Sequence, residues 1–179
     1  MLGAYGLQCV NLVHERWADQ VRLADEILAV NPVIGADWAH VGVFAAVRMD
    51  DLPTARRLRE AFDQATPGRR NEADAMAADG GIATLEGRNA DARALYLQAL
   101  RMMRELGLRT WLGILTLDAL ASGTLDADEH RRAADEAREI FTSVRAQRLL
   151  DRLDALATPS VGASKPSRAG IASGAEVRG

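Results

Sequence analysis

The sequence predicts an all-α fold in which antiparallel helix pairs stack as a short solenoid. Apolar residues recur at helical spacing along most of the chain, and Gly, Pro, Asn and Asp fall between these runs as turn signals. No run alternates convincingly between apolar and polar residues, as a half-buried strand would. Aromatic residues make up only 4% of the 179 residues, so we expect a core of small and medium aliphatic side chains packed between helices. Eight helices are expected, in this order: about 6–30, 37–49, 53–65, 71–86, 90–106, 110–121, a seventh that ends at 144, and 148–156.

Turn residues set the boundaries of the first four expected helices. Proline disfavours helical geometry in the residue before it, so the first helix ends before Asn31-Pro32. The second ends at Met49, and Pro53 lies in the first turn of the third, where a missing donor costs nothing. The third stops before Thr66-Pro67-Gly68. Gly80 and Gly81 lie inside the fourth and each costs ~1 kcal/mol relative to Ala, so we expect a packing reason for glycine there.

Glycines and acidic residues set the boundaries of the last four. Gly107 follows the fifth helix as a stop signal, and Ser122-Gly123 ends the sixth. Asp126 or Asp128 can cap the seventh, because a carboxylate accepts hydrogen bonds from the free amides of a first turn. Residues 158–179 are rich in Pro, Gly, Ser and Ala. We therefore expect one helical domain over 1–157 and a disordered tail over 158–179.

A residue pattern recurs along this domain. Its clearest copy has small residues at helix crossings, a glycine at the turn and an aromatic residue for the core: Gly80, Ala83, Gly87, Ala92, Tyr96 and Ala99. This segment resembles a tetratricopeptide (TPR) repeat. Weaker copies precede and follow it, with Trp38, Val41, Gly42, Ala55 and Phe62, and with Leu112, Leu115, Leu117, Ala133, Ala134, Ala137 and Phe141. Ala55, Ala92 and Ala133 are 37 and 41 positions apart, a longer and less regular period than the ~34 residues of a TPR.

The resemblance extends to a class of regulators. Residues 37–156, with the closing text AREIFTSVRAQRLLDRLDAL, look like the C-terminal TPR-like modules of large bacterial signalling regulators. Those modules are joined to nucleotide-cyclase domains, or to ATPase and DNA-binding domains as in LuxR-type transcriptional regulators. This sequence departs from them in lacking such domains. The resemblance therefore implies, as an alternative to a general binding module, a stand-alone or truncated regulatory segment.

The composition of the sequence argues against several classes of partner. The formal net charge of −3 and pI near 5.6 predict no general attraction to nucleic acid or anionic membranes. No stretch approaches the ~18 apolar residues of a membrane span. Cys9 is the only cysteine, which excludes an internal disulfide and favours a reducing, cytoplasmic setting. The arginine pairs, such as Arg56-Arg57, have carboxylates at helical spacing, so we expect ion pairs rather than a nucleic-acid surface.

No pattern of catalytic or metal-binding residues stands out. The only lysine, Lys165, lies in the tail, so a phosphate-binding loop is missing. His14 has no second histidine four residues later, as a helical zinc site needs. One cluster resembles a set of acid–base groups or metal ligands, namely Asp126, Asp128, Glu129 and His130. Helix capping explains it better. We expect no enzyme activity, no cofactor and no metal.

The sequence thus predicts a non-catalytic protein-binding or regulatory module. In a stack of helix pairs, the first helix of each pair lines an inner groove, which we expect to bind a peptide, a protein segment or a small effector. By analogy with TPR repeats, the partner-facing residues are Val43 and Val47 in one pair and Thr84 and Arg88 in the next. An exposed first helix would also favour a homodimer.

Overall fold

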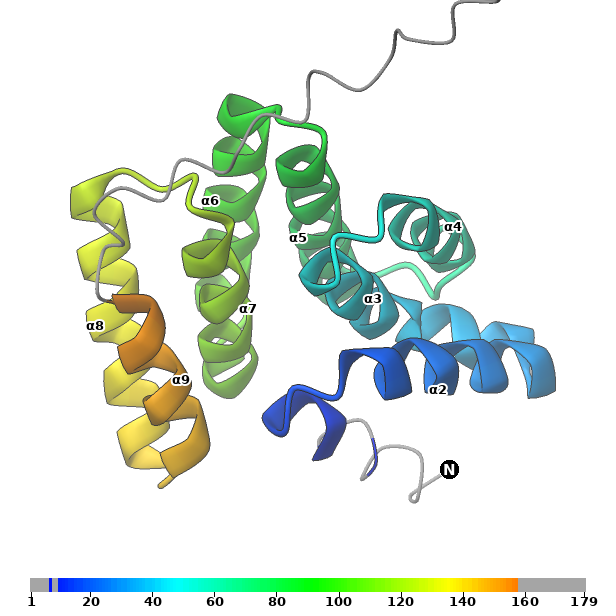
Figure 1. The fold of residues 1–179 in the computed structure, drawn as a ribbon, viewed down its shortest axis with the longest axis horizontal. Coiled ribbons are helices and arrows are strands. Elements are labelled where there is room, and N and C mark those ends of the chain that lie inside the picture. The colour runs from blue at the N-terminus through cyan, green and yellow to red at the C-terminus, as the bar shows by residue number, and fades with distance from the viewer. Residues whose placement is uncertain (1–6, 8–9, 158–179) are drawn as a thin grey trace, which may run out of the picture.

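The computed structural model describes residue 7 and residues 10–157 and is, within them, built from helices and short turns (Figure 1). A short helical segment at residues 10–13 comes first. Eight longer helices follow: α2 (Trp17–Val30), α3 (Pro32–Arg48), α4 (Leu52–Phe62), α5 (Arg69–Leu85), α6 (Asn89–Glu105), α7 (Arg109–Ser122), α8 (Ala127–Ser143) and α9 (Gln147–Ala157). Cys9 and the tail expected at 158–179 lie outside the described residues.

The helices form a sequential stack of antiparallel pairs. α3 packs with α4, α5 with α6, and α7 with α8, while α2 covers α3 at one end of the stack and α9 packs on α7 and α8 at the other (Figure 1). The first helices of successive pairs also contact one another, α3 with α5 and α5 with α7, and α9 continues this row. The predicted all-α stack, which resembles a helical repeat, is confirmed.

Small residues let the helices approach closely, as the repeat pattern predicts. A Cβ on Gly80 would lie 3.2 Å from the ring of Tyr96, which is 2% exposed in the core. A Cβ on Gly81 would lie 2.9 Å from Val47 Cγ2 on the neighbouring pair, and one on Gly113 would lie 2.8 Å from Phe141. Glycine inside α5 therefore serves packing against α6 and α3, which outweighs its low helix propensity.

Two expected helix boundaries at the start of the chain are wrong. The helix expected over 6–30 is broken at His14–Arg16, where Glu15 has a left-handed φ of 55° and the chain turns before α2. The second helix begins at Pro32 rather than at 37. Asn31 caps it by accepting a hydrogen bond from the Ile34 N–H at 3.1 Å, and Pro32 occupies the first turn. The same dipeptide thus ends one helix and starts the next.

The other expected boundaries agree more closely. α4 ends at Phe62, three residues before the predicted stop at 65. The remaining starts and ends of α4 to α9 lie within two residues of the predicted positions. These segments have strong punctuation, either glycine with left-handed φ, as at Gly87, Gly107 and Gly123, or an acidic cap.

Arginines, among them members of the adjacent pairs, form ion pairs, several of which join different helices. Arg57 of α4 reaches Asp25 of α2 at 2.7 Å, and Arg104 of α6 reaches Glu136 of α8 at 2.7 Å. Most of these side chains are substantially exposed, so each pair contributes little stability on its own. Their effect is to fix how neighbouring helices are aligned.

The N-terminal segment contacts the last helix. Glu15 pairs with Arg152 of α9 at 3.1 Å, and the Arg152 guanidinium lies 4.9 Å above the ring of Trp17. Arg148 of α9 also lies 3.1 Å from the ring nitrogen Nδ1 of His14. We call these five residues the α9 junction. They join α9 to the turn before α2, although the two are far apart in sequence.

Among the described residues, none of the helices combines the length and the apolar composition needed to cross a bilayer.

Candidate binding cleft

A cleft of about 850 Å³ lies where the first helices of the pairs end. The C-terminal ends of α3, α5 and α7, the turn after α7 and the last turn of α9 all contribute to it. Its apolar wall consists of Phe44, Val47, Leu85, Leu120, Ala121, Leu125, Ala155 and Leu156. Ligand pockets commonly measure ~300–1,000 Å³, so this cleft has room for a small effector or a few residues of peptide.

An ion pair forms the polar part of the cleft wall. Arg48, the last residue of α3, donates from Nε to Oδ1 of Asp118 in α7 at 2.9 Å, and from Nη2 to the Leu117 carbonyl oxygen at 2.9 Å. The two side chains are only 17% and 11% exposed. Water and salt screen such a pair less than one on the surface. Arg152 of the α9 junction lies 3.9 Å from the same Asp118 oxygen. The cleft wall is thereby connected to the junction.

His130 lines the same cleft from the first turns of α8. Its Nε2 is buried and has no hydrogen-bond partner among the described residues. An unpaired buried polar group costs about 1–3 kcal/mol. An occupant able to reach this nitrogen would remove that cost.

Two of the acidic residues beside His130, Asp126 and Glu129, cap α8. Asp126 accepts hydrogen bonds from the backbone N–H groups of Asp128 and Glu129 at 3.1 and 2.9 Å. The Glu129 carboxylate in turn accepts from the Asp126 N–H at 3.1 Å. The backbone hydrogen bond from Glu129 and the nearby Arg93 hold the pKa of Asp126 below its usual value. The capping interpretation is confirmed for Asp126 and Glu129, whereas Asp128 pairs with Arg131 at 2.7 Å.

The residues predicted to face a partner lie in different environments. Val43 is 0% exposed and belongs to the core, not to the cleft wall. Val47 and Thr84 do line the cleft, from α3 and α5. The Thr84 hydroxyl donates to the Gly80 carbonyl oxygen at 2.9 Å and keeps its lone pairs for another donor. The structure thus brings two of the predicted residues to one surface, and Val43 is closed to any partner in this conformation.

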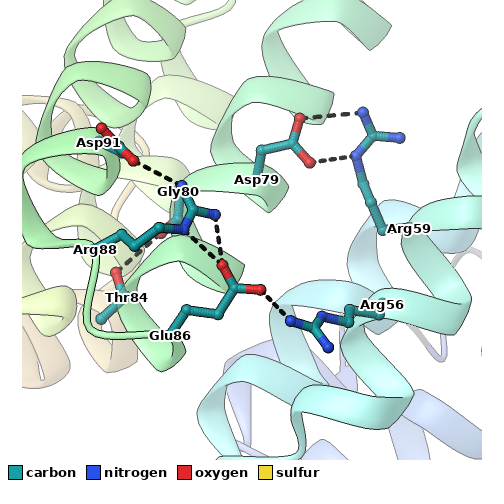
Figure 2. A network of polar contacts seen from close by, with 8 residues as sticks. All are labelled: Arg56, Arg59, Asp79, Gly80, Thr84, Glu86, Arg88 and Asp91. Carbon is teal, nitrogen blue, oxygen red and sulfur yellow. Dashed lines mark hydrogen bonds and ion pairs between the residues drawn. The ribbon is translucent and has the colours of Figure 1, made fainter.

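Arg88 is exposed and belongs to an ion-pair network next to the cleft (Figure 2). It donates to Glu86 and to Asp91, each at 2.8 Å. Glu86 also accepts from Arg56 of α4, so the network joins α4 to the turn between α5 and α6 (Figure 2). Hydrogen bonds from Arg56 and Arg88 hold the pKa of Glu86 below its usual value. Figure 2 shows Arg88 directed at these carboxylates. Arg88 does not line the cleft, although its neighbour Gly87 does.

A second group of polar residues is buried between α3, α5 and α7. His40 and Asp74 are both 0% exposed, with His40 Nε2 3.7 Å from Asp74 Oδ2. Trp111 donates from Nε1 to Asp74 Oδ1 at 2.7 Å, and Arg70 lies 3.1 Å from Oδ2. Burial lowers the pKa of His40 below its ordinary value, although Asp74 opposes this effect. This group links three helices, and because His40 and Asp74 are closed to solvent they offer no surface for a substrate.

Metal binding finds no support in the side chains that the structure describes. No group of three or more His, Cys, Asp or Glu residues within residue 7 and residues 10–157 is placed to hold an ion.

Sequence reasoning missed Arg48 and Asp118 as cleft residues. They are 70 positions apart, and their meeting depends on the contact between neighbouring pairs. One signal was available, because Asp118 interrupts the otherwise apolar run GILTLDAL. A carboxylate in a helix face that packs against other helices needs a partner there.

Comparison with known proteins gives no relative: no protein-family model, no curated protein and no solved structure matches this chain. The description that the structure supports is an architectural one, a sequential stack of antiparallel helix pairs.

Proposed function

We propose that the protein is a non-catalytic binding module whose cleft at the ends of α3, α5 and α7 holds a peptide segment of a partner protein. The observation that carries this proposal is the cleft itself, about 850 Å³ in volume and formed jointly by successive helix pairs. A stack of helix pairs commonly presents such a shared surface to a partner. The cleft combines an apolar wall with a few polar groups, as peptide-binding sites do.

The ionisable groups also favour binding over acid–base chemistry. Arg48 and Asp118 are paired with each other on the cleft wall. A catalytic site needs groups that converge on one reacting atom and are held ready to exchange a proton. His40 and Asp74, the closest approach to a catalytic pair, are fully buried.

Selection from a random peptide library displayed on phage tests the proposal. The bait is the full chain, and each enriched peptide is measured against Thr84→Arg, which places a long side chain in the cleft. Thr142→Arg is the matched control, because Thr142 is an exposed residue of α8 that does not line the cleft. We expect binding to weaken at least tenfold in Thr84→Arg and to persist in Thr142→Arg. Peptides that bind both variants equally, or no enriched peptide at all, would contradict the proposal.

A second candidate function is regulation of a catalytic or DNA-binding protein, as the resemblance to modules of bacterial signalling regulators implies. The supporting observation is that Asp118 contacts both Arg48 in the cleft and Arg152 in the α9 junction. An occupant that shifts Asp118 would change the contacts of the last helix. Such a signal requires that the ligand bind two states of the stack with different affinity.

Co-purification from the native cell after cross-linking tests this second candidate. Recovery of a nucleotide-cyclase or DNA-binding chain with the wild type and with Thr142→Arg would support regulation. If the recovered proteins include neither kind of chain, the regulatory candidate fails and the peptide-binding proposal stands on its own experiment.

A further inference from the structure

The Arg48–Asp118 pair presents one donor and one acceptor that its own contacts do not use. Nε and Nη2 of Arg48 both contact Oδ1 of Asp118, and Nη2 also contacts the Leu117 carbonyl oxygen. None of the contacts that these two side chains make with described residues uses Nη1 of Arg48 or Oδ2 of Asp118. A guanidinium nitrogen can only donate and a carboxylate oxygen can only accept. The cleft wall therefore carries one donor and one acceptor within a single ion pair.

The charge balance of this wall disfavours a singly charged ligand. An anion attracted to Arg48 would approach Asp118 as well, and a cation attracted to Asp118 would approach Arg48. Either ligand obtains its full electrostatic attraction only by breaking the Arg48–Asp118 pair. The side chain that is not bound to the ligand then remains partly buried without a counter-ion, which is unfavourable. Two further charged residues lie nearby. Arg152, 3.9 Å from Oδ1 of Asp118, is balanced by its ion pair with Glu15 at 3.1 Å, and Asp50 of the lining is exposed at the turn after α3.

A neutral group that both donates and accepts has no such penalty. An extended peptide residue, whose own N–H and C=O point to the same side, can donate its N–H to Oδ2 of Asp118 and accept at its carbonyl oxygen from Nη1 of Arg48, while the pair stays intact. The walls beside the pair are apolar, with Phe44, Leu120 and Leu156. Branched aliphatic side chains next to the amide would bury their surface there, with a free-energy gain proportional to the area removed from water.

Building on the proposed binding function, we infer that the cleft recognises an uncharged backbone amide flanked by aliphatic side chains, with Arg48 and Asp118 as its recognition pair. The occupant is thus an aliphatic, uncharged segment of a partner protein. Segments that rely on a carboxylate or an ammonium group are rejected by the charge balance of the pair.

Three probes with similar branched aliphatic bodies test the inference. N-acetyl-leucine methylamide is uncharged, whereas N-acetyl-leucinate carries a carboxylate and leucine methylamide an ammonium group on nearly the same body. Each is titrated into the ¹⁵N-labelled full chain, and the backbone amide signals of Thr84, Ser122 and Gly123 are followed by NMR. At an ordinary binding free energy per atom, ligands of this size bind with a Kd of about 1 mM. We expect the amide probe to bind at least tenfold more tightly than either charged probe.

A double variant and a matched control separate recognition from stability. Arg48→Met with Asp118→Leu removes both charges together and keeps similar volume, while the neighbouring Arg152 keeps its ion pair with Glu15. Arg104→Met with Glu136→Leu makes the same kind of change at another ion pair between helices, away from the cleft. The amide probe is expected to lose at least tenfold in affinity in the first variant and to bind the second as it binds the wild type.

The outcomes distinguish this inference from the function on which it rests. If a charged probe shifts the cleft signals at equal or lower concentration, or if the double variant binds the amide probe normally, the inference is overturned while the cleft remains a binding site. If no probe shifts those signals, the inference is overturned too. The proposed function then stands or falls with the peptide selection and its Thr84→Arg variant.

Discussion

Replacing Gly35 by alanine tests the close packing of α2 on α3. A Cβ at position 35 would lie 2.5 Å from the Cα and 2.7 Å from the backbone nitrogen of Leu28. Because these atoms belong to the backbone of α2, no side-chain rotation relieves the contact. Carbon atoms pack at about 3.5–4.0 Å, so α2 must move away from α3 by about 1 Å.

The expected free-energy change combines opposing effects. Adding a methyl group to a well-packed interior costs about 1–3 kcal/mol, and alanine recovers about 1 kcal/mol through its higher helix propensity. The displacement of α2 also separates the buried Ala24 from Gly42 of α3. A gap of about 0.5–1 Å forfeits a quarter to a half of the dispersion energy of the atoms that line it. We expect a net destabilisation of about 2 kcal/mol, which lowers Tm by roughly 4–8 °C in a protein of this size.

Urea unfolding followed by far-UV circular dichroism measures this change. The control is Gly68→Ser, because a Cβ at Gly68 would have no heavy atom within 4 Å and its φ of 169° suits any residue. We expect the control to stay within about 0.5 kcal/mol of the wild type, since serine and glycine both serve as N-caps. A Gly35→Ala protein as stable as the wild type would refute the crossing of α2 and α3 described above.

Three further predictions concern buried and capping groups. Trp111→Phe removes the donor to the buried Asp74 carboxylate and is expected to cost about 1–3 kcal/mol in urea unfolding; an unchanged midpoint would argue against that hydrogen bond. Asp126→Ala removes the cap of α8 and is expected to lower the unfolding free energy by about 1 kcal/mol in thermal melts followed by circular dichroism. Asp128→Ala changes no cap and should cost less in the same measurement; equal losses in both variants would argue against the cap. The lowered pKa of His40 means that the unfolded chain binds a proton more readily, so stability is lost as pH falls below the unfolded value of 6.5. The urea midpoint should therefore drop between pH 7.5 and 5.5, and the drop should be smaller in His40→Leu; equal slopes in both proteins would rule out His40 as its source.

The stack was predictable where local signals and packing requirements agree. In α5 and α6, the small residues of the repeat pattern coincide with the close approach of Gly80 to Tyr96, and Gly87 supplies the left-handed turn between the helices. Asp126 has both the residue type and the position of an N-cap, and the structure places it there. Such features depend on neighbours close in sequence, which a single sequence displays directly.

The misread features depend on contacts across the fold. Nothing local marks Glu15 as a residue with left-handed φ, since glutamate has ordinary helix propensity, and its position goes with its contact to Arg152 in α9. Val43 and Val47 are one helical turn apart on α3, and helical spacing alone does not show that the first faces the core and the second the cleft. The meeting of Arg48 with Asp118 requires the alignment of two pairs, which the sequence pattern does not specify.

The α9 junction changes how the stack is expected to come apart. In an open array each repeat contacts only its neighbours, so terminal repeats can detach while the middle stays folded. Here Arg152 contacts Glu15 before α2 as well as Asp118 in α7. Detaching α9 therefore also removes the contacts that hold the turn before α2. Fraying at one extremity is thereby coupled to fraying at the other, and the array gains cooperativity that a linear row of repeats does not have.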